Sequence, residues 1–388
     1  MKKTAILFLA IFICITGITC EKKPQTFDEA LALSASEGKP LLLDFFAEWC
    51  GPCVRFTKAL NEDTDINKAL KNVLLYQIDC EKGDGVELSE KYTIKGYPTY
   101  ILIDSKEQVI DRWMGFEKAY FIETLTETKV DLTTIDEKTS RFAANPNIKD
   151  AVVLGRYNSA IGEYINAVNY YTQAQQLNKD DSKDFTFDIF YNTARGIYRE
   201  QFTYDNAALA AMDVIKNGDS DDKIQTSNIM IRLAKRMDKQ DDLAKYINNG
   251  LAVSDDSDDP DIQRTHKLLL AAKCLYVTGD TIAAVEYKRD AMFDGWLDTP
   301  DGLNEFAWWC FENLTNLEEA EQLAAKAVNL AESGSQKAMI LDTHAQILKA
   351  NGKLEEAITV MEMAVVEEPD NKQWPKTLEI FKTELDSR

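Results

Sequence analysis

The sequence predicts an α/β domain followed by an all-α solenoid of helical repeats. Helical and extended patterns alternate up to about residue 129, and the pattern then weakens around the Asn-Pro-Asn at 145–147. Beyond it, small and apolar residues recur every three or four positions without strand signals. Alternating helices and strands are typical of an α/β protein. We therefore divide the chain into a leader (1–20), an α/β domain (21–130), a linker (131–150) and a helical region (151–388).

Eight segments of the α/β domain follow the order α-β-α-β-α-β-β-α. The helices are expected from apolar residues at helical spacing, and the strands from short, largely apolar runs. A polar stretch separates the last two strands and predicts a hairpin, so the central sheet is expected to be mixed. The expected helices span 26–39, 53–63, 84–94 and 117–129, and the expected strands span 40–47, 72–80, 98–104 and 109–115.

A ladder of small residues recurs in the helical region. Ala345, Gly352, Ala357 and Ala364 describe two helices with a turn at the glycine, and related ladders lie further upstream. Small residues let neighbouring helices approach closely. The pattern resembles tetratricopeptide repeats, which implies a solenoid of about five to six stacked helix pairs. The resemblance also implies that protein partners bind on these repeats.

The first twenty residues have the composition of a secretion signal. Lys2 and Lys3 precede a largely apolar stretch at 5–19, which is shorter than a membrane-spanning helix needs. An uncleaved anchor is the alternative. The tetrapeptide ending at Cys20 is similar to the lipobox of bacterial lipoproteins, although Thr19 stands where those boxes carry Ala, Gly or Ser. We therefore expect an exported protein of the bacterial periplasm or cell envelope, with Cys20 as a lipidation site.

Charge and cysteine content exclude several classes of function. The formal net charge of −21 disfavours nucleic acid and anionic membranes, so membrane contact is expected only through a lipid anchor. Without Cys14 and Cys20 of the leader, five cysteines remain, too few in a long chain for the disulfide scaffold of a small secreted protein. Cys50 and Cys53 have a spacing that zinc sites also use, but both histidines, His266 and His344, lie in the helical region. We expect no metal and no cofactor.

The Trp-Cys-Gly-Pro-Cys segment at 49–53 carries the chemistry. Pro52 suits the first turn of a helix, because a proline there loses no hydrogen bond, so Cys50 is expected just before a helix N-terminus. Free backbone N–H groups and the helix dipole favour a thiolate at this position. Cys50 is therefore expected to be the exposed nucleophile that attacks a substrate disulfide. Cys53, shielded one turn later, then resolves the mixed disulfide.

Asp44 lies within the apolar strand that precedes the two cysteines. Burial in such a strand raises the pKa of a carboxyl group, and the position suits a group that passes a proton to or from Cys53. The alternative is an aspartate on an edge strand that faces water. Cys80 ends the next expected strand, and we interpret it as a small buried side chain rather than a regulatory thiol.

Two stretches resemble thioredoxins. Residues 44–53, Asp-Phe-Phe-Ala-Glu-Trp-Cys-Gly-Pro-Cys, are similar to the family's active-site strand and loop, and residues 95–103, Lys-Gly-Tyr-Pro-Thr-Tyr-Ile-Leu-Ile, are similar to its second landmark. The resemblance implies that Pro98 is a cis proline opposite the dithiol. It also implies that Tyr97 presents its backbone to a substrate chain as an added strand. Trp49, Gly51 and Pro52 are then supporting residues of the site.

The resemblance covers about residues 27–128 and departs from the family at one notable position. Leu75 stands where a lysine usually lies near the buried acid, which puts the tuning of the proton shuttle in doubt. The stretch at 37–50 and the long segment at 61–72 also resemble periplasmic reductase domains that pass electrons outward from the membrane.

The function that these features favour is an exported thiol–disulfide oxidoreductase, specifically a protein-disulfide reductase. Its expected partners are proteins with disulfides, an upstream thiol that donates electrons, and proteins recruited by the helical repeats. The alternative is a redox-sensing scaffold, in which the repeats bind a partner and the dithiol is regulatory.

Overall fold

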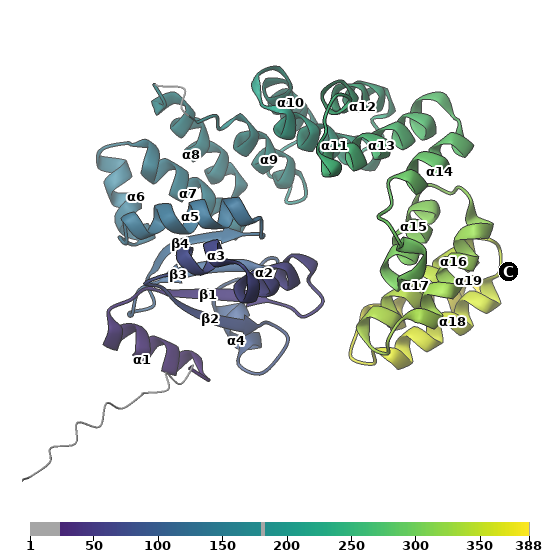
Figure 1. Cartoon of the computed structure of the whole chain (residues 1–388), viewed down its shortest axis with the longest axis horizontal. Coiled ribbons are helices and arrows are strands. Elements are labelled where there is room, and N and C mark those ends of the chain that lie inside the picture. The colour runs from purple at the N-terminus through teal and green to yellow at the C-terminus, as the bar shows by residue number, and fades with distance from the viewer. Residues whose placement is uncertain (1–23, 180–182, 388) are drawn as a thin grey trace, which may run out of the picture.

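The structure, a computed structural model, describes residues 24–179 and 183–387, so the expected leader and Cys20 lie outside it. Its N-terminal domain is the predicted α/β domain (Figure 1). The helices of this domain are α1 (Phe27–Glu37), α2 (Gly51–Glu62), α3 (Thr64–Ala69), α4 (Gly85–Lys91) and α5 (Lys118–Val130). The strands are β1 (Leu41–Phe46), β2 (Leu74–Asp79), β3 (Thr99–Ile103) and β4 (Val109–Met114).

The sheet is mixed, as predicted, with the strand order β2-β1-β3-β4. Strand β1 runs parallel to β2 and antiparallel to β3, and β3 forms an antiparallel pair with β4. Helix α3 was not expected. It begins because the Asp63 carboxylate accepts hydrogen bonds from the backbone N–H groups of Asp65 and Ile66, which is a typical N-cap.

Strand β1 is central and buried on both faces. Leu42 packs in a core with α2, α3 and α5, whereas Leu43 and Phe45 pack in a second core with α1 and α4. Because side chains alternate along a strand, Asp44 lies on the same face as Leu42, the face that α2 covers. The fold therefore directs this carboxyl group toward the helix that carries the second cysteine.

The second half is all-helical, as predicted. Residues 148–179 and 183–367 form six consecutive helix pairs, in which the two helices of each pair pack on each other, and α19 follows. The helices are α7 (Ile148–Ile161), α8 (Tyr164–Leu177), α9 (Thr186–Ile197), α10 (Tyr204–Asn217), α11 (Ser220–Arg236), α12 (Gln240–Ser254), α13 (Pro260–Lys273), α14 (Thr281–Asp290), α15 (Pro300–Glu312), α16 (Leu317–Leu330), α17 (Ser335–Ala350), α18 (Leu354–Glu367) and α19 (Gln373–Asp386).

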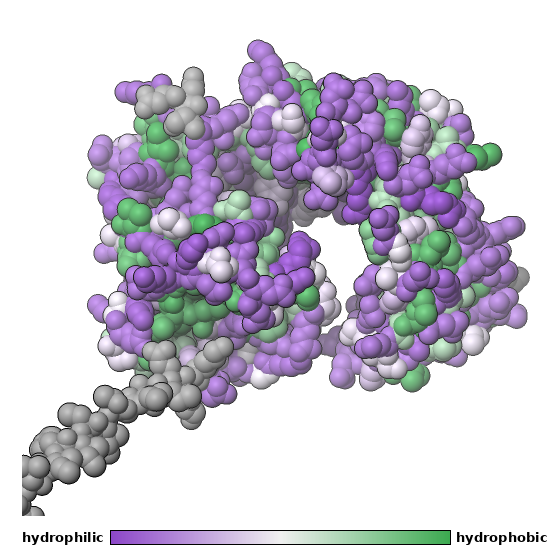
Figure 2. Space-filling view, viewed as in Figure 1, coloured by the Kyte–Doolittle hydropathy of each residue, from purple (hydrophilic) through white to green (hydrophobic). Residues whose placement is uncertain are grey.

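The chain as a whole curves into an arc. The α/β domain lies at one end and helices α17–α19 at the other, with an opening between them, and α2 lies on the side of the domain that faces this opening (Figure 1). The face seen in Figure 2 is predominantly hydrophilic around the opening. Among the helices within 24–179 and 183–387, none combines the length and apolar composition needed to cross a membrane.

The segment 131–150, expected to be a linker, contains helix α6 (Ile135–Ala144). A capping box starts the helix: the Thr134 hydroxyl accepts from the backbone N–H of Glu137, whose carboxylate accepts from the backbone N–H of Thr134. The helix ends before the Asn-Pro-Asn, where a break was predicted. The segment is thus not an extended connection, and the weak sequence pattern reflects a short helix with many charged residues.

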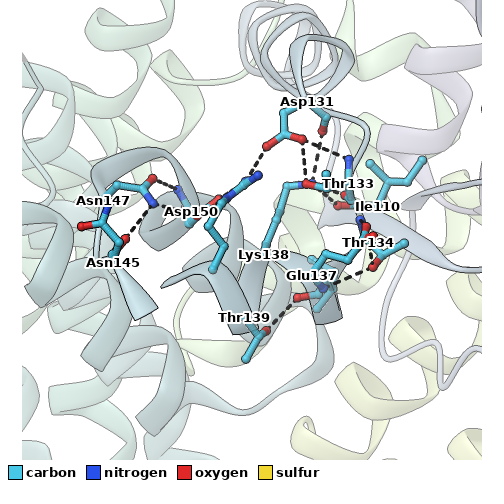
Figure 3. Close-up of polar contacts among 12 residues, drawn as sticks. Ile110, Asp131, Thr133, Thr134, Glu137, Lys138, Thr139, Asn145, Asn147 and Asp150 are labelled. Carbon is cyan, nitrogen blue, oxygen red and sulfur yellow. Dashed lines mark hydrogen bonds and ion pairs between the residues drawn. The ribbon is translucent and has the colours of Figure 1, made fainter. Parts of the chain in front are cut away.

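A buried lysine fixes α6 against the sheet. Lys138 is buried, and its ammonium group donates hydrogen bonds to the carbonyl oxygens of Ile110, Asp131 and Thr133 (Figure 3). Burial lowers the pKa of Lys138. Because Ile110 belongs to β4, this lysine joins the end of α5, helix α6 and the edge strand of the sheet.

A buried ion pair joins the sheet to the helical region. Helix α7 packs on β4, and the Arg156 Nη2 atom lies 2.6 Å from Asp111 Oδ2. The Thr128 hydroxyl donates to the same oxygen at 2.6 Å. Both charged side chains are buried. The helical region therefore begins as a rigid continuation of the α/β domain.

Candidate active site

The two cysteines lie where strand β1 gives way to helix α2. Cys50 is the N-cap of α2, and its sulfur accepts a hydrogen bond from the backbone N–H of Cys53 at 3.3 Å. Pro52 occupies the first turn. The predicted placement of Cys50 immediately before a helix N-terminus is confirmed, so the free N–H groups and the helix dipole act on this sulfur.

Cys50 and Cys53 form a disulfide, with their Cα atoms 5.2 Å apart. The expectation that Cys50 is exposed does not hold in this oxidised form, because Cys50 and Cys53 are 4% and 3% exposed. A difference remains in what they contact: Cys50 lines a surface groove, and Cys53 does not. The disulfide bond itself covers part of each sulfur.

The groove beside Cys50 has a volume of about 450 Å³. Its walls come from the loop before α2 and from the segment that leads into β3. The Tyr97–Pro98 peptide bond is cis. The Tyr97 ring meets the Trp49 ring edge to face, with centroids 5.8 Å apart. The groove is lined by Trp49, Cys50, Gly51, Pro52, Ile94, Lys95, Gly96 and Tyr97.

The loop after β2 holds the tryptophan in place, which the sequence analysis did not foresee. The indole N–H of Trp49 donates to Glu81 Oε1 at 2.9 Å, although the side chain of this tryptophan is 63% exposed. The neighbouring Glu48 forms an ion pair with Lys82. Sequence alone offers no signal for these contacts, since the two loops lie far apart in the chain and are brought together by the pairing of β1 with β2.

Asp44 is buried in the centre of the sheet, 1% exposed, which rules out the alternative of an edge-strand aspartate that faces water. Its partner is Gln77, whose Nε2 donates to Asp44 Oδ2 at 3.0 Å. The other carboxyl oxygen has no hydrogen-bond partner among the described residues. Burial raises the pKa of Asp44 to about 7, and the hydrogen bond from Gln77 opposes part of this rise.

Gln77 is thus a site residue that the sequence analysis missed. It pairs with Asp44 in the register of β1 and β2, whereas Leu75 pairs with Leu42. The available signal was that Gln77 is a polar side chain in the middle of a largely apolar strand. No hydrogen bond joins Asp44 to either cysteine within the described residues, so a proton passing between Asp44 and Cys53 needs a mediator or a change on reduction.

We expect Asp44→Asn to stabilise the fold by about 4 kcal/mol at pH 8, and by less than half of that at pH 5. The unfolded carboxyl group ionises near its ordinary value of 3.8, whereas the folded one ionises near 7. Stability is therefore lost as pH rises between these values and stays low above them; roughly three pKa units correspond to about 4 kcal/mol. Urea denaturation at pH 5, 6, 7 and 8 measures the difference.

Gln77→Leu is the matched variant. It removes the hydrogen bond that favours the charged carboxylate, so the pKa of Asp44 should rise further. The loss of folding stability with rising pH should then extend to higher pH. Equal gains from Asp44→Asn at pH 5 and pH 8 would contradict the raised pKa.

Cys80 is not a reactive thiol of this site. Cys80 is buried, burial raises the pKa of its thiol to about 12, and the thiol interacts with the Tyr97 hydroxyl. It therefore stays protonated, which fits a packing role better than a reactive one. The described residues contain no group of three or more His, Cys, Asp or Glu side chains that could hold a metal ion.

Comparison with known proteins agrees with this geometry. Residues 23–105 match the family model described as Thioredoxin-like. The N-terminal domain is thioredoxin-like. Over 96 residues the chain is 38% identical to Thioredoxin Y1, chloroplastic, from Arabidopsis thaliana, covering 24% of this chain and 52% of that protein. Over 101 residues it is 34% identical to the Thiol:disulfide interchange protein DsbD of Yersinia pestis, covering 25% of this chain and 17% of that protein.

Each of these matches covers about a quarter of the chain. A solution structure of a thioredoxin from Thermus thermophilus covers 27% of this chain and 84% of its own, with 24% identity and a TM-score of 0.25. The chain spans about half of the chloroplast thioredoxin and a smaller share of the interchange protein. The residues matched by the family model, 23–105, include the CxxC pair.

Proposed function

We propose that the chain is an exported protein-disulfide reductase whose helical region recruits its partners. The observation that supports this most directly is the Cys50–Cys53 pair at the start of α2, with Cys50 on a groove large enough for an extended peptide. Tyr97, which precedes Pro98 through a cis peptide bond, lines the opposite wall, where a substrate chain can add as a strand.

The reaction proceeds by two exchanges. The Cys50 thiolate attacks one sulfur of a substrate disulfide, and the other substrate sulfur leaves as a thiolate and takes up a proton. The Cys53 thiol then loses its proton, with Asp44 as the acceptor, and attacks Cys50 Sγ. The Cys50–Cys53 disulfide forms and the second substrate sulfur leaves reduced. Two electrons have passed to the substrate, and an upstream thiol must return them.

The helical pairs are proposed to be tetratricopeptide-like repeats that present partners to the dithiol. Ala345, Ala357 and Ala364 are fully buried where α17 and α18 pack, and Gly352 has a φ of 80° at the turn between them. A left-handed residue there favours glycine. An opening between the two ends of the arc remains in the space-filling view (Figure 2), and we place the recruited partner there, on the side that α2 faces.

Export is proposed from the leader and from the redox chemistry. Disulfides persist outside the reducing cytosol, so a protein-disulfide reductase finds stable substrates in the periplasm or cell envelope. Lipidation at Cys20 would hold the protein at a membrane. Mass spectrometry of the mature N-terminus tests both points.

The proposed reductase should trap its clients when the second exchange is blocked. Cys53→Ala leaves the first attack intact but removes the group that resolves the mixed disulfide, so covalent complexes should accumulate. They are detected on non-reducing gels and identified by mass spectrometry. Several different clients, all absent from a Cys50→Ser/Cys53→Ala control, support the reductase. A single partner, bound equally without Cys50, would instead favour the redox-sensing scaffold.

A further inference from the structure

A cavity separate from the dithiol groove lies between the thioredoxin-like domain and the first helix pairs. It has a volume of about 260 Å³ and is lined by residues of β4, α5, α7, α8 and α9. Aromatic side chains dominate its wall, Trp113 and Tyr171 among them, and none of the residues of the dithiol groove contributes to it.

Asp188, on α9, brings a carboxylate to this cavity without a counter-ion. Among the described residues, no cation lies within ion-pair distance and no donor makes a hydrogen bond to its carboxyl oxygens. Burial raises the pKa of Asp188 to about 7, while the more distant charges of Lys183 and Arg156 oppose part of that rise. The group is thus poorly compensated by the protein itself.

Arg195, on the same helix, brings an uncompensated cation. Its guanidinium donates to the Tyr191 hydroxyl at 3.2 Å and lies 5.5 Å from the ring centres of Tyr164 and Tyr191. No carboxylate within the described ranges forms an ion pair with it. Arg156 differs, because Asp111 neutralises it at 2.6 Å.

Two further polar atoms of the wall lack partners. Trp113 Nε1, a donor, and Asn192 Oδ1, an acceptor, are both buried and make no hydrogen bond with any described residue. Buried polar groups in native proteins are nearly always hydrogen-bonded. A ligand in the cavity could therefore accept a hydrogen bond from Trp113 and donate one to Asn192, in addition to pairing with the two charged side chains.

We propose that this cavity binds a small zwitterion of dipeptide size, with its ammonium group on Asp188 and its carboxylate on Arg195. The two side chains arise about two turns, or roughly 10 Å, apart along α9. The two charges of an extended dipeptide are separated by roughly 7 Å, and the Asp188 and Arg195 side chains can lean toward each other to meet them. The charges of a single amino acid are too close together to reach both side chains. The aromatic wall accommodates an apolar side chain.

Calorimetry with the full chain and a panel of alanyl dipeptides, varied at the second residue, tests the proposal. The tightest ligand is then compared with its N-acetylated and C-amidated forms, each of which lacks one charge. Each modification should weaken binding by about tenfold or more, the loss expected for one charge-assisted hydrogen bond. Asp188→Asn and Arg195→Gln should each do the same with the free dipeptide.

Crossing variants with ligands assigns each charge to its partner. Asp188→Asn should no longer distinguish the free from the acetylated dipeptide, and Arg195→Gln should no longer distinguish the carboxylate from the amide. Asp205→Asn and Arg199→Gln, which lie outside the cavity, are the matched controls and should retain wild-type affinity, as should Cys50→Ser. The proposal is overturned if no dipeptide binds, if the blocked ligands bind as tightly, or if both variants keep wild-type affinity.

Discussion

Cys50→Ser is expected to abolish disulfide reduction, lowering the rate of insulin reduction above the thiol background by at least about 1000-fold, in line with the removal of other enzymatic nucleophiles. A serine oxygen at the start of α2 cannot form the mixed disulfide, however well the helix end would stabilise its charge. The fold should be unaffected, because serine fits the space of the sulfur and can still accept the N–H of residue 53 as an N-cap.

Cys274→Ser makes the same chemical change in the helical region and should retain wild-type activity. Cys53→Ala should still form the mixed disulfide through Cys50 but should not release it, so the variant should show no turnover. A Cys50→Ser chain with a tenth or more of the wild-type rate would refute the assignment of the nucleophile, and the helical region would then be the functional part of the chain.

Sequence periodicity was enough to predict the architecture. The apolar run at β1 and the hairpin between β3 and β4 led to the mixed sheet, and the small-residue ladder led to the stacked helix pairs, because both signals are local. Helix α6 was not predicted, because its formation depends on a capping box and on the burial of one lysine. Lys138 is polar in sequence, and only the carbonyl groups gathered around it make its burial favourable.

The residues proposed for the candidate site from sequence all lie in short motifs, and the contacts between neighbouring strands were not foreseen. The two cysteines and Asp44 were singled out from the residues themselves, and Pro98 from the resemblance to thioredoxins. Gln77 became visible only through the register that sets it beside Asp44, and Glu81 only through the loop that reaches Trp49. Such contacts join distant segments, and a single sequence carries no local sign of them.

Arg156→Met is expected to destabilise the protein by about 3–5 kcal/mol, the typical cost of breaking a buried ion pair by removing one partner. Asp111 is fully buried and would keep only the Thr128 hydroxyl and the backbone N–H of the next residue, Arg112, as donors. Its charge would then lack compensation in a medium of low dielectric constant. Urea denaturation followed by far-UV circular dichroism measures the loss.

The double variant Asp111→Leu/Arg156→Met separates charge from packing. If the cost of the single variant comes from an orphaned carboxylate, replacing both partners by apolar side chains should recover most of the stability. Lys382→Met, which breaks an exposed ion pair with Glu362 on α18, is the control and should cost no more than about 1 kcal/mol. A loss below about 1 kcal/mol in Arg156→Met would mean that α7 is held on β4 by apolar contacts alone. The helical region could then move relative to the dithiol, and the arc would no longer fix the distance between a recruited partner and Cys50.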